Sequence, residues 1–169
     1  VAIARLGGEA HLASRIGDDE IADLITGGLK REGVDIALIK RYAENRSSFS
    51  SIYIDATGER QIMNYRDERL PTNGDWINES AAPGLTAVLA DTRWLNGALA
   101  AMHLARRLNI AGIVDAEAPV LEAEAALYAA SHVAFSAQGI FDLTGCSTVE
   151  EAALAADQML PGKVIATDG

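Results

Sequence analysis

The stretch RSSFSSIYIDATGERQIMNY, residues 46–65, predicts the element around which the chain is organised, a β-hairpin. Two runs that favour extended structure, 50–55 and 60–65, flank Ala56-Thr57-Gly58-Glu59, where Gly58 can supply the positive φ of a tight turn. A two-residue turn at Thr57-Gly58 predicts a register that gives each cross-strand pair plausible chemistry. The predicted pairs are Asp55 with Arg60, Tyr53 with Ile62, and Ser51 with Asn64.

This register gives the ribbon two faces. One face carries Phe49, Ser51, Tyr53, Ile62 and Asn64. The other, more apolar face carries Ser50, Ile52, Ile54, Gln61, Met63 and Tyr65. Because a two-stranded ribbon is only marginally stable by itself, we expect both faces to meet the parent domain, a second subunit or a ligand. The alternative is an ordinary hairpin packed on a core.

Length and composition indicate one soluble globular unit with an appended ribbon. The chain has 169 residues, 49% of them hydrophobic, which is enough for one good core. The net charge of −10 argues against a general affinity for nucleic acid or anionic membranes, since no basic excess displaces counterions. Cys146 is the single cysteine, which fits a reducing cytoplasm. No apolar run reaches transmembrane length and no signal peptide is evident, and both ends of the chain look cut.

The residues before the hairpin predict short elements. We expect the last turns of a helix over 1–6, a strand over 11–16, a helix that closes at Gly33 and a strand over 37–41. The helix before Gly33 starts at Gly17-Asp18-Asp19, and its predicted apolar face comprises Ile21, Leu24, Ile25 and Leu29. The two Asp residues suit the positive end of this helix, and metal binding or acid–base work is the alternative.

After the hairpin, strands alternate with helices. A polar connection over 70–83, with a turn around Trp76, comes first. Strands are predicted over 85–90, 110–115, 132–135 and 163–167, and helices over 97–108, 120–130, 140–143 and 149–160. This alternation predicts a three-layer α/β architecture with a mainly parallel sheet and right-handed crossovers.

Ligands of such sheets bind at the carboxyl ends of the strands. That rule singles out Asp91-Thr92-Arg93, Asp115, Ser136 and Thr167-Asp168-Gly169. Arg93 suits a phosphate, sulfonate or carboxylate, or else a salt bridge to Asp91 or to a loop carboxylate. Asp115 could hold a metal or a hydroxyl, or cap the next helix.

The sequence gives weaker evidence for a functional role of the other candidate residues. Thr167 and Gly169 would let the backbone approach a nucleotide closely, or would simply end a strand. The three histidines, His11, His103 and His132, show no metal-ligand spacing. Trp76 and Trp94 are interpreted as packing anchors. Neither a Walker A loop nor a Gly-x-Gly-x-x-Gly segment is present.

The order of motifs resembles the ribokinase, or PfkB, family of carbohydrate kinases over essentially the whole chain. The motifs are LGG, SRIGDD, REGVD, SSFSSIYIDATGERQIMNY, VLADTRW, VDAEAP, AFSAQG, LTG and VIATDG. The resemblance implies a ribokinase-like domain over 1–169, to which residues 37–66 contribute a β-lid that closes over the sugar and often mediates dimerisation. It also implies transfer of the γ-phosphoryl group of ATP, with Mg²⁺, to a sugar hydroxyl. The GER-x-I-x-NY and A-D-x-R-W segments are similar to the sulfofructose kinase-like branch.

Site residues follow from the resemblance position by position. Asn64 and Arg93 are expected to contact the sugar and its anionic or distal end, with Ser51 beside Asn64 on the predicted ribbon face. Thr167 and Gly169 match the start of the nucleotide-binding T-x-G-x-x-G segment. Ser136 stands where many members have the Asn of an N-x-x-E motif and Gly139 stands at its Glu, which leaves open how magnesium is held.

Two segments of the family pattern lie outside residues 1–169. These are the amino-terminal strand with the sugar-binding Asp, and the D-T-x-G-A-G-D segment with the catalytic base. Since general base catalysis needs a group within hydrogen-bond reach, we expect this polypeptide alone to be inactive. The alternative function is a non-catalytic sugar- or nucleotide-binding module that dimerises through the hairpin. Fructose-like, keto-deoxy acid, nucleoside and sulfosugar substrates all remain open.

Overall fold

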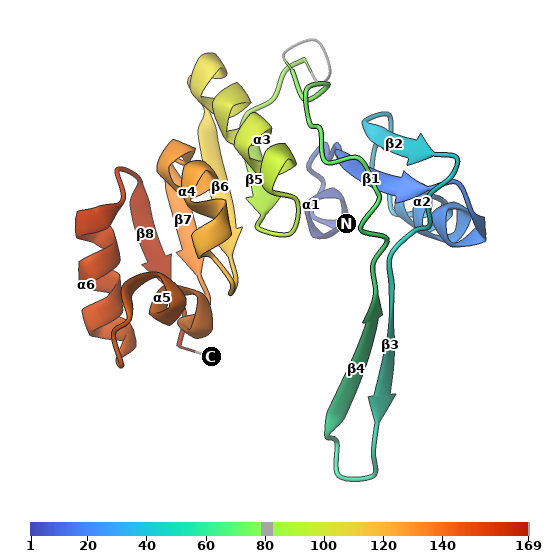
Figure 1. Ribbon diagram of the computed structural model, residues 1–169. Coiled ribbons are helices and arrows are strands. Elements are labelled where there is room, and N and C mark those ends of the chain that lie inside the picture. The colour runs from blue at the N-terminus through green and yellow to red at the C-terminus, as the bar shows by residue number, and fades with distance from the viewer. Residues whose placement is uncertain (79–82, 169) are drawn as a thin grey trace. The chain divides into compact units, whose positions relative to one another are not determined.

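The computed structural model describes residues 1–78 and 83–168 (Figure 1). The chain forms two compact units, Val1–Pro71 and Thr72–Gly169. Gly169 and part of the predicted connection over 70–83, residues 79–82, lie outside the described residues.

The first unit contains a small parallel sheet and one long helix. Strands β1 (Ser14–Gly17) and β2 (Ile39–Tyr42) pair in parallel, and α2 (Glu20–Arg31) connects them; the short helix α1 (Ala2–Arg5) precedes β1. Asp19 is the N-cap of α2 and accepts a hydrogen bond from Ala22 N at 2.9 Å, which confirms the predicted capping role.

The predicted apolar face of α2 is wrong in part. The buried residues of the helix are the small Ala22 and Thr26, whereas Leu24 is 74% exposed. Arg41 of β2 donates a hydrogen bond to the hydroxyl of Thr26 at 3.0 Å. Arg41 also pairs with Asp23 of α2 at 2.7 Å, so the helix meets its sheet through small side chains and polar contacts of Arg41 rather than through Leu24.

The predicted hairpin is present, but its predicted register is wrong. Strands β3 (Phe49–Ile54) and β4 (Arg60–Tyr65) pair antiparallel through the following partners: Phe49–Tyr65, Ser50–Asn64, Ser51–Met63, Ile52–Ile62, Tyr53–Gln61 and Ile54–Arg60. The loop has three residues rather than two. Gly58 N donates to Asp55 O at 3.1 Å, Asp55 N donates to Glu59 O at 3.1 Å, and Gly58 has a φ of 89°. A turn followed by a left-handed glycine is the usual three-residue hairpin loop.

The shift of one residue exchanges the faces of one strand relative to the other, because side chains alternate along a strand. One observed face carries Phe49, Ser51, Tyr53, Gln61, Met63 and Tyr65; the other carries Ser50, Ile52, Ile54, Arg60, Ile62 and Asn64. Ser51 and Asn64 therefore lie on opposite faces of the ribbon, not on the same face as predicted.

The second unit is a four-stranded parallel sheet with the order β5-β6-β7-β8. Its strands are β5 (Ala87–Asp91), β6 (Ala111–Ala116), β7 (His132–Phe135) and β8 (Lys163–Ala166). Its helices are α3 (Leu95–Leu108), the 3-10 turn η1 (Leu121–Ala123), α4 (Glu124–Ala129), α5 (Ala137–Thr144) and α6 (Val149–Met159). The predicted alternation of strands and helices is confirmed, with boundaries shifted by a few residues.

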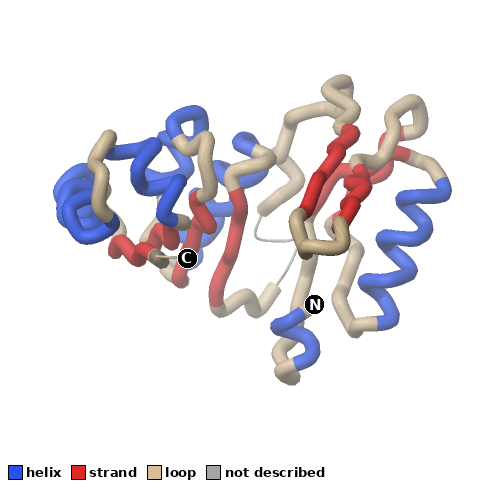
Figure 2. Tube along the Cα trace, turned by 90° about the horizontal axis from the view of Figure 1, so that it is seen from below, coloured by secondary structure: helices blue, strands red, loops and turns tan. Residues whose placement is uncertain are grey.

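The core of this unit lies on one face of the sheet. The fully buried side chains include Met102, Val114, Val120, Leu127, Val133, Phe135 and Ile140. Burial of each such side chain contributes about 1.5 to 3 kcal/mol. On the other face, Leu89 is 61% and Ile165 is 52% exposed. Right-handed crossovers between sequential neighbours bring the helices to the same side of the sheet, which Figure 2 shows for this unit.

The two tryptophans are packing residues, as interpreted from the sequence. Their ring centroids lie 5.2 Å apart, and the indole N–H of Trp94 donates to Thr72 O at 2.8 Å. The Trp94 ring also fills the space beside Gly97, where a Cβ atom would meet it. This pair fixes the segment over 72–78 to the start of α3.

Candidate functional site

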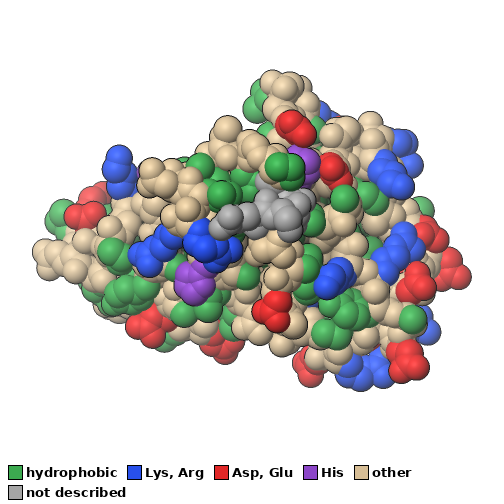
Figure 3. Space-filling model, turned by 90° about the horizontal axis from the view of Figure 1, so that it is seen from above, with side chains coloured by type: hydrophobic (Ala, Val, Ile, Leu, Met, Phe, Trp, Pro, Cys, Tyr) green, Lys and Arg blue, Asp and Glu red, His purple; other side chains and the backbone are tan. Residues whose placement is uncertain are grey.

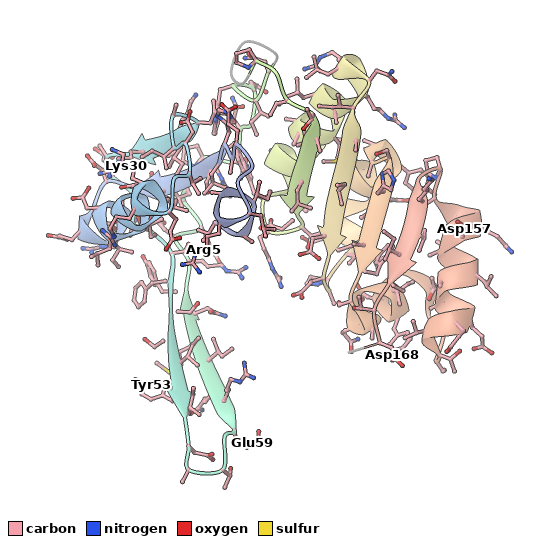
Figure 4. The ribbon with its side chains drawn as sticks, turned by 180° about the vertical axis from the view of Figure 1, so that it is seen from behind. Arg5, Lys30, Tyr53, Glu59, Asp157 and Asp168 are labelled. Carbon is pink, nitrogen blue, oxygen red and sulfur yellow. The ribbon has the colours of Figure 1, made fainter. Side chains whose placement is uncertain are left out.

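The carboxyl ends of β5 to β8 meet at one edge of the sheet, which we call the strand-end edge. Residues 91–93, 115–117, 136 and 167–168 compose it. The parallel register aligns Asp91 with Asp115 on the neighbouring strand and Phe135 with Ala166. Figure 1 shows the four arrowheads at this edge, and Figure 4 labels Asp168 there, directly after β8. The sheet thus brings together four of the groups that the sequence singled out.

Arg93 contributes an accessible positive charge to the strand-end edge. Its guanidinium lies 3.6 Å from a carboxylate oxygen of Glu117, and the two side chains are 44% and 61% exposed. Asp91 does not pair with the guanidinium; its carboxylate accepts from Arg93 N at 2.8 Å and shapes the turn after β5. Because exposed ion pairs contribute at most about 1 kcal/mol, the contact with Glu117 leaves Arg93 able to meet an anionic ligand.

Thr92 fixes the turn that presents Arg93. The residue is buried, and its hydroxyl donates to Glu117 O at 3.1 Å. The loop after β5 is thereby tied to the loop after β6, which carries the partner of Arg93. The alternative that Arg93 forms a salt bridge with a loop carboxylate is therefore observed. The sequence did not identify Glu117 as that carboxylate, because the pair joins residues that lie in different strand-to-helix loops.

Ser136 begins α5 at the strand-end edge. Its hydroxyl oxygen accepts from Gly139 N at 3.1 Å, so the side chain is the N-cap of the helix. The N-terminus of a helix carries partial positive charge and unpaired N–H groups, which suit a phosphate. Ser136 can therefore serve a nucleotide through the helix end that it stabilises.

Gly139 lies against the backbone of β6. A Cβ atom at this position would come within 2.2 Å of Ala116 O, so residue 139 has no room for a side chain. The Glu of the N-x-x-E motif cannot be accommodated here without a backbone shift. Among the described residues, no group of three or more His, Cys, Asp or Glu side chains could hold a metal ion. The residues at this motif do not fit a magnesium site.

Thr167 continues the sheet beyond β8. Its backbone N–H donates to Phe135 O at 3.0 Å, and its hydroxyl lies 3.4 Å from the same oxygen. The side chain is exposed next to Asp168. Gly169, the third residue of the predicted nucleotide segment, lies outside the described residues.

Asp115 is exposed at the end of β6 and does not cap the following helix. The next helical turn starts at Leu121, and Val120 N donates its hydrogen bond to the carboxylate of Asp142 in α5 at 2.8 Å. The alternative that Asp115 caps this helix is therefore wrong. Asp142 was missed because it lies 22 residues further along the chain.

The histidines occupy three separate environments, in agreement with their sequence spacing. His11 lies 3.2 Å from carboxylate oxygens of both Glu9 and Asp35. His132 is 2.9 Å from the Ser131 hydroxyl. His103 is exposed on α3, beside a surface hollow of about 390 Å³. None of these contacts assembles a catalytic group.

Asn64 of the ribbon has a partner that sequence reasoning missed. Its side-chain Oδ1 accepts from the Ser50 hydroxyl at 2.6 Å, across the strand pair. This contact directs the carbonyl end of the amide toward β3 and leaves the NH₂ group as the end that can donate to a ligand. Ser51, on the opposite face, cannot meet a ligand that Asn64 contacts on its own face.

Charged side chains of both signs lie on the surface. Figure 3 shows Lys and Arg side chains interspersed with Asp and Glu on the face that it presents. In the part of the chain that the structure describes, the helices are too short or too polar to span a bilayer.

These features define an α/β protein whose sheet edge offers an arginine, a capped helix N-terminus and the exposed hydroxyl of Thr167. The family described as "pfkB family carbohydrate kinase" matches residues 1–169, and the chain therefore belongs to the pfkB family of carbohydrate kinases.

Similar proteins give the same assignment. A proposed ribokinase from Agrobacterium tumefaciens is 33% identical and superposes with a TM-score of 0.87 over 99% of this chain. Arabidopsis thaliana ribokinase, solved with ribose and ATP, shares the fold at 16% identity, with a TM-score of 0.75 over 96% of this chain. Fructokinase-1 from Oryza sativa subsp. japonica is 36% identical over 67 residues, which are 40% of this chain and 21% of that protein. The expected ribokinase-like α/β fold is confirmed.

The chain spans about half the length of the solved structures that it matches. It covers 56% of the Agrobacterium protein and 55% of the Arabidopsis ribokinase.

Proposed function

We propose that the whole protein is a sugar kinase, which transfers the γ-phosphoryl group of ATP to a hydroxyl of a sugar or sugar derivative. The observation that carries this proposal is the family match over residues 1–169. The strand-end edge supports it, because phosphoryl transfer depends on positioning and on stabilisation of negative charge.

Arg93 and Asn64 are the proposed sugar contacts. Arg93 offers a forked cation at the end of β5, suited to an anionic or heavily hydroxylated part of the ligand. Asn64 offers the NH₂ end of an amide whose oxygen is held by Ser50. Since Ser51 lies on the other ribbon face, its expected role beside Asn64 is the weakest of the three, and Ser50 is the better partner for Asn64.

The proposed nucleotide contacts are Ser136, Thr167 and Gly169. Ser136 supports them through the N-terminus of α5, where unpaired N–H groups favour a phosphate. Thr167 follows β8 at the same edge. ATP is the proposed phosphoryl donor, and the Arabidopsis ribokinase, which was solved with ATP, supports this choice. Magnesium is expected with ATP in this family, but position 139 contributes no carboxylate to it.

Residues 1–169 alone are proposed to be inactive. The resemblance places the catalytic base and the anion-stabilising segment outside this stretch, and the strand-end edge supplies no assembled base of its own. Binding of a sugar or a nucleotide would survive without the base, because binding and proton transfer use different groups.

The substrate class is proposed from Arg93 and from the relatives. Fructokinase-1 and a ribokinase solved with ribose point to a pentose or a ketohexose. The exposed guanidinium of Arg93 supports a ligand with an anionic end, such as a keto-deoxy sugar acid or a sulfosugar of the sulfofructose kinase-like branch. These classes differ in charge, which makes them separable by experiment.

The test is sugar-dependent ADP release in a coupled assay. The panel is fructose, ribose, a keto-deoxy sugar acid, a nucleoside and a sulfosugar. Stimulation by one class, with the whole protein and not with residues 1–169, is the expected result. Equal stimulation with residues 1–169 would show that the catalytic base lies within them.

The second candidate function is a non-catalytic binding module that dimerises through the ribbon. The observation that favours dimerisation is the exposed apolar surface on both ribbon faces, including Tyr53 at 59%, Ile54 at 66% and Met63 at 58% exposure. A homodimer is proposed in either case, and molar mass in solution tests it. A cytoplasmic location is part of the proposal, because the single Cys146 suits a reducing compartment.

A further inference from the structure

The ribbon projects from the first unit with its strands largely exposed. Every residue of β4 is exposed, and within β3 only Ser51 is half-buried. Figure 1 shows the two strands leaving the region of β1, β2 and α2 as a narrow arm. Its direction must therefore be set where it joins the unit. We call this junction the hairpin base and define it as residues 45–48 and 66–69.

Ser47 attaches the first leg of the base to β1 and α2. The residue has no exposed surface. Its hydroxyl oxygen accepts from Gly17 N at 3.1 Å, and its backbone N–H donates to the carboxylate of Asp19 at 2.8 Å. The other oxygen of Asp19 caps α2. One serine thus links the leg to the last residue of β1 and to the first turn of the helix.

Gly17 shows how closely this leg approaches β1. A Cβ atom on Gly17 would lie 2.4 Å from Asn45 O and 2.6 Å from Ser47 N. Backbone atoms cannot yield as a flexible side chain can, so the contact requires glycine. The first leg and the strand are in direct backbone contact.

Asp67 joins the second leg to the first. Its side chain is 3% exposed. One carboxylate oxygen accepts from Arg46 N at 2.9 Å and lies 3.3 Å from Asn45 Nδ2. The same carboxylate also receives the backbone N–H and the guanidinium of Arg69, at 3.1 and 3.0 Å. A buried carboxylate with this many donors holds both legs at a fixed separation.

We propose that Asp19, Ser47 and Asp67 are positioning residues that set the direction of the β3–β4 ribbon relative to β1, β2 and α2. They act through the backbone of the hairpin base and need no contact with a ligand. Loss of any one of these hydrogen bonds would leave the ribbon paired internally and free to change its direction. That the hairpin base directs a lid over a sugar rests on the proposed function.

The test is a distance distribution measured by pulsed electron paramagnetic resonance. Spin labels are placed on cysteines at the exposed positions Lys30 in α2 and Glu59 at the ribbon tip, both labelled in Figure 4, with Cys146→Ser as background. We expect one narrow distribution for the unmodified base. Ser47→Ala and Asp67→Asn should each broaden it about twofold, because a locally weakened junction opens without global unfolding.

Matched controls distinguish a weakened hairpin base from general effects of substitution in this unit. Ser50→Ala removes a hydroxyl from the ribbon itself, and Asp35→Asn removes a carboxylate charge elsewhere in the unit; both should leave the width unchanged. Far-UV circular dichroism of the labelled samples establishes that each variant is folded. If Ser47→Ala does not fold, the distance distribution of Asp67→Asn tests the proposal, because this variant keeps the side-chain volume.

If the width of the distance distribution is unchanged in folded Ser47→Ala and Asp67→Asn, the proposal is wrong. The measurement uses neither sugar nor ATP. Failure of the kinase proposal would leave a broadened distribution standing, and an unchanged distribution would leave the kinase proposal untouched.

Discussion

At the scale of single residues, substitution of Arg93 tests whether the proposed substrate has an anionic group. In the whole protein, Arg93→Ala should lower kcat/KM by the equivalent of about 2 to 5 kcal/mol if the guanidinium pairs with a buried anionic group of the ligand. Glu117→Gln removes the partner of Arg93 and should leave kcat/KM unchanged or raise it.

Arg31→Ala, at an exposed arginine on α2, is the matched control and should have no effect. Equal losses for Arg93→Ala and Glu117→Gln would mean that the pair at 3.6 Å is only a structural contact.

Asp67 makes the stability of the first unit depend on pH. The Arg69 side chain, and then Arg46 N, hold the pKa of this carboxyl well below its ordinary value of 3.8. A depressed pKa in the folded state adds stability above the unfolded value, and this stability is lost as the pH falls through the folded pKa. Asp19 has a lowered pKa for a related reason, chiefly its bond from Ser47 N.

We therefore expect the free energy of unfolding to fall as the pH is lowered below about 4, and Asp67→Asn to reduce that dependence while lowering stability at pH 7. Urea unfolding at several pH values measures both. Asp157→Asn, at an exposed carboxylate of α6, is the control. The same pH dependence in Asp67→Asn as in the unmodified chain would contradict the assignment.

Gly139 is required by packing at the start of α5. Gly139→Ala should destabilise the second unit by about 1 to 3 kcal/mol, because the added Cβ would be forced against Ala116 O. Gln138→Ala, at the exposed neighbouring position, should change stability by less than about 0.5 kcal/mol. Chemical denaturation decides, and equal stabilities of the two variants would show that α5 can move away from β6.

At the scale of elements, the hairpin register is the clearest structural prediction. Nuclear Overhauser effects between Hα atoms should connect Ile52 with Ile62 and Ser50 with Asn64. They should not connect Tyr53 with Ile62, the pair of the two-residue turn. Detection of the second pattern would restore the predicted faces and return Ser51 to the side of Asn64. Gly58→Ala, which strains the residue with a φ of 89°, is the companion variant that should weaken these signals.

The parallel sheet and its helices could be predicted because each strand is a short, mainly apolar run between turn residues. The strand over 132–135 was predicted to the residue, and α6 to within one residue of its end. The hairpin was predicted as an element, but its register was not. Both ribbon faces carry apolar side chains, so a shift by one residue costs little burial, and Gly58 suits a two- or a three-residue loop equally.

The site could be predicted as far as topology alone determines it. Residues at strand ends share an edge in any parallel sheet, so Arg93, Asp115, Ser136 and Thr167 were found. Side-chain partners could not be found in this way. Glu117 beside Arg93, and Asp142 at the start of η1, meet their partners only through the tertiary fold. The hairpin base was missed for the same reason, since Asp67 and Arg46 are 21 residues apart.

At the scale of the whole molecule, the proposed kinase activity rests on family membership. The family match covers residues 1–169, and the strand-end edge offers the positive groups that phosphoryl transfer needs. One sheet face of the second unit is exposed at Leu89 and Ile165. The chain covers 56% of the length of the Agrobacterium relative.

The most direct test of the central claim is phosphorus NMR of the product formed by the whole protein from ATP and the stimulating sugar. We predict a new phosphomonoester signal that appears only when sugar is present. The phosphomonoester and ADP should form in equal amounts. Arg93→Ala should slow the growth of this signal. ADP accompanied by inorganic phosphate alone, or no turnover with any sugar class while sugar still binds, would contradict the kinase assignment.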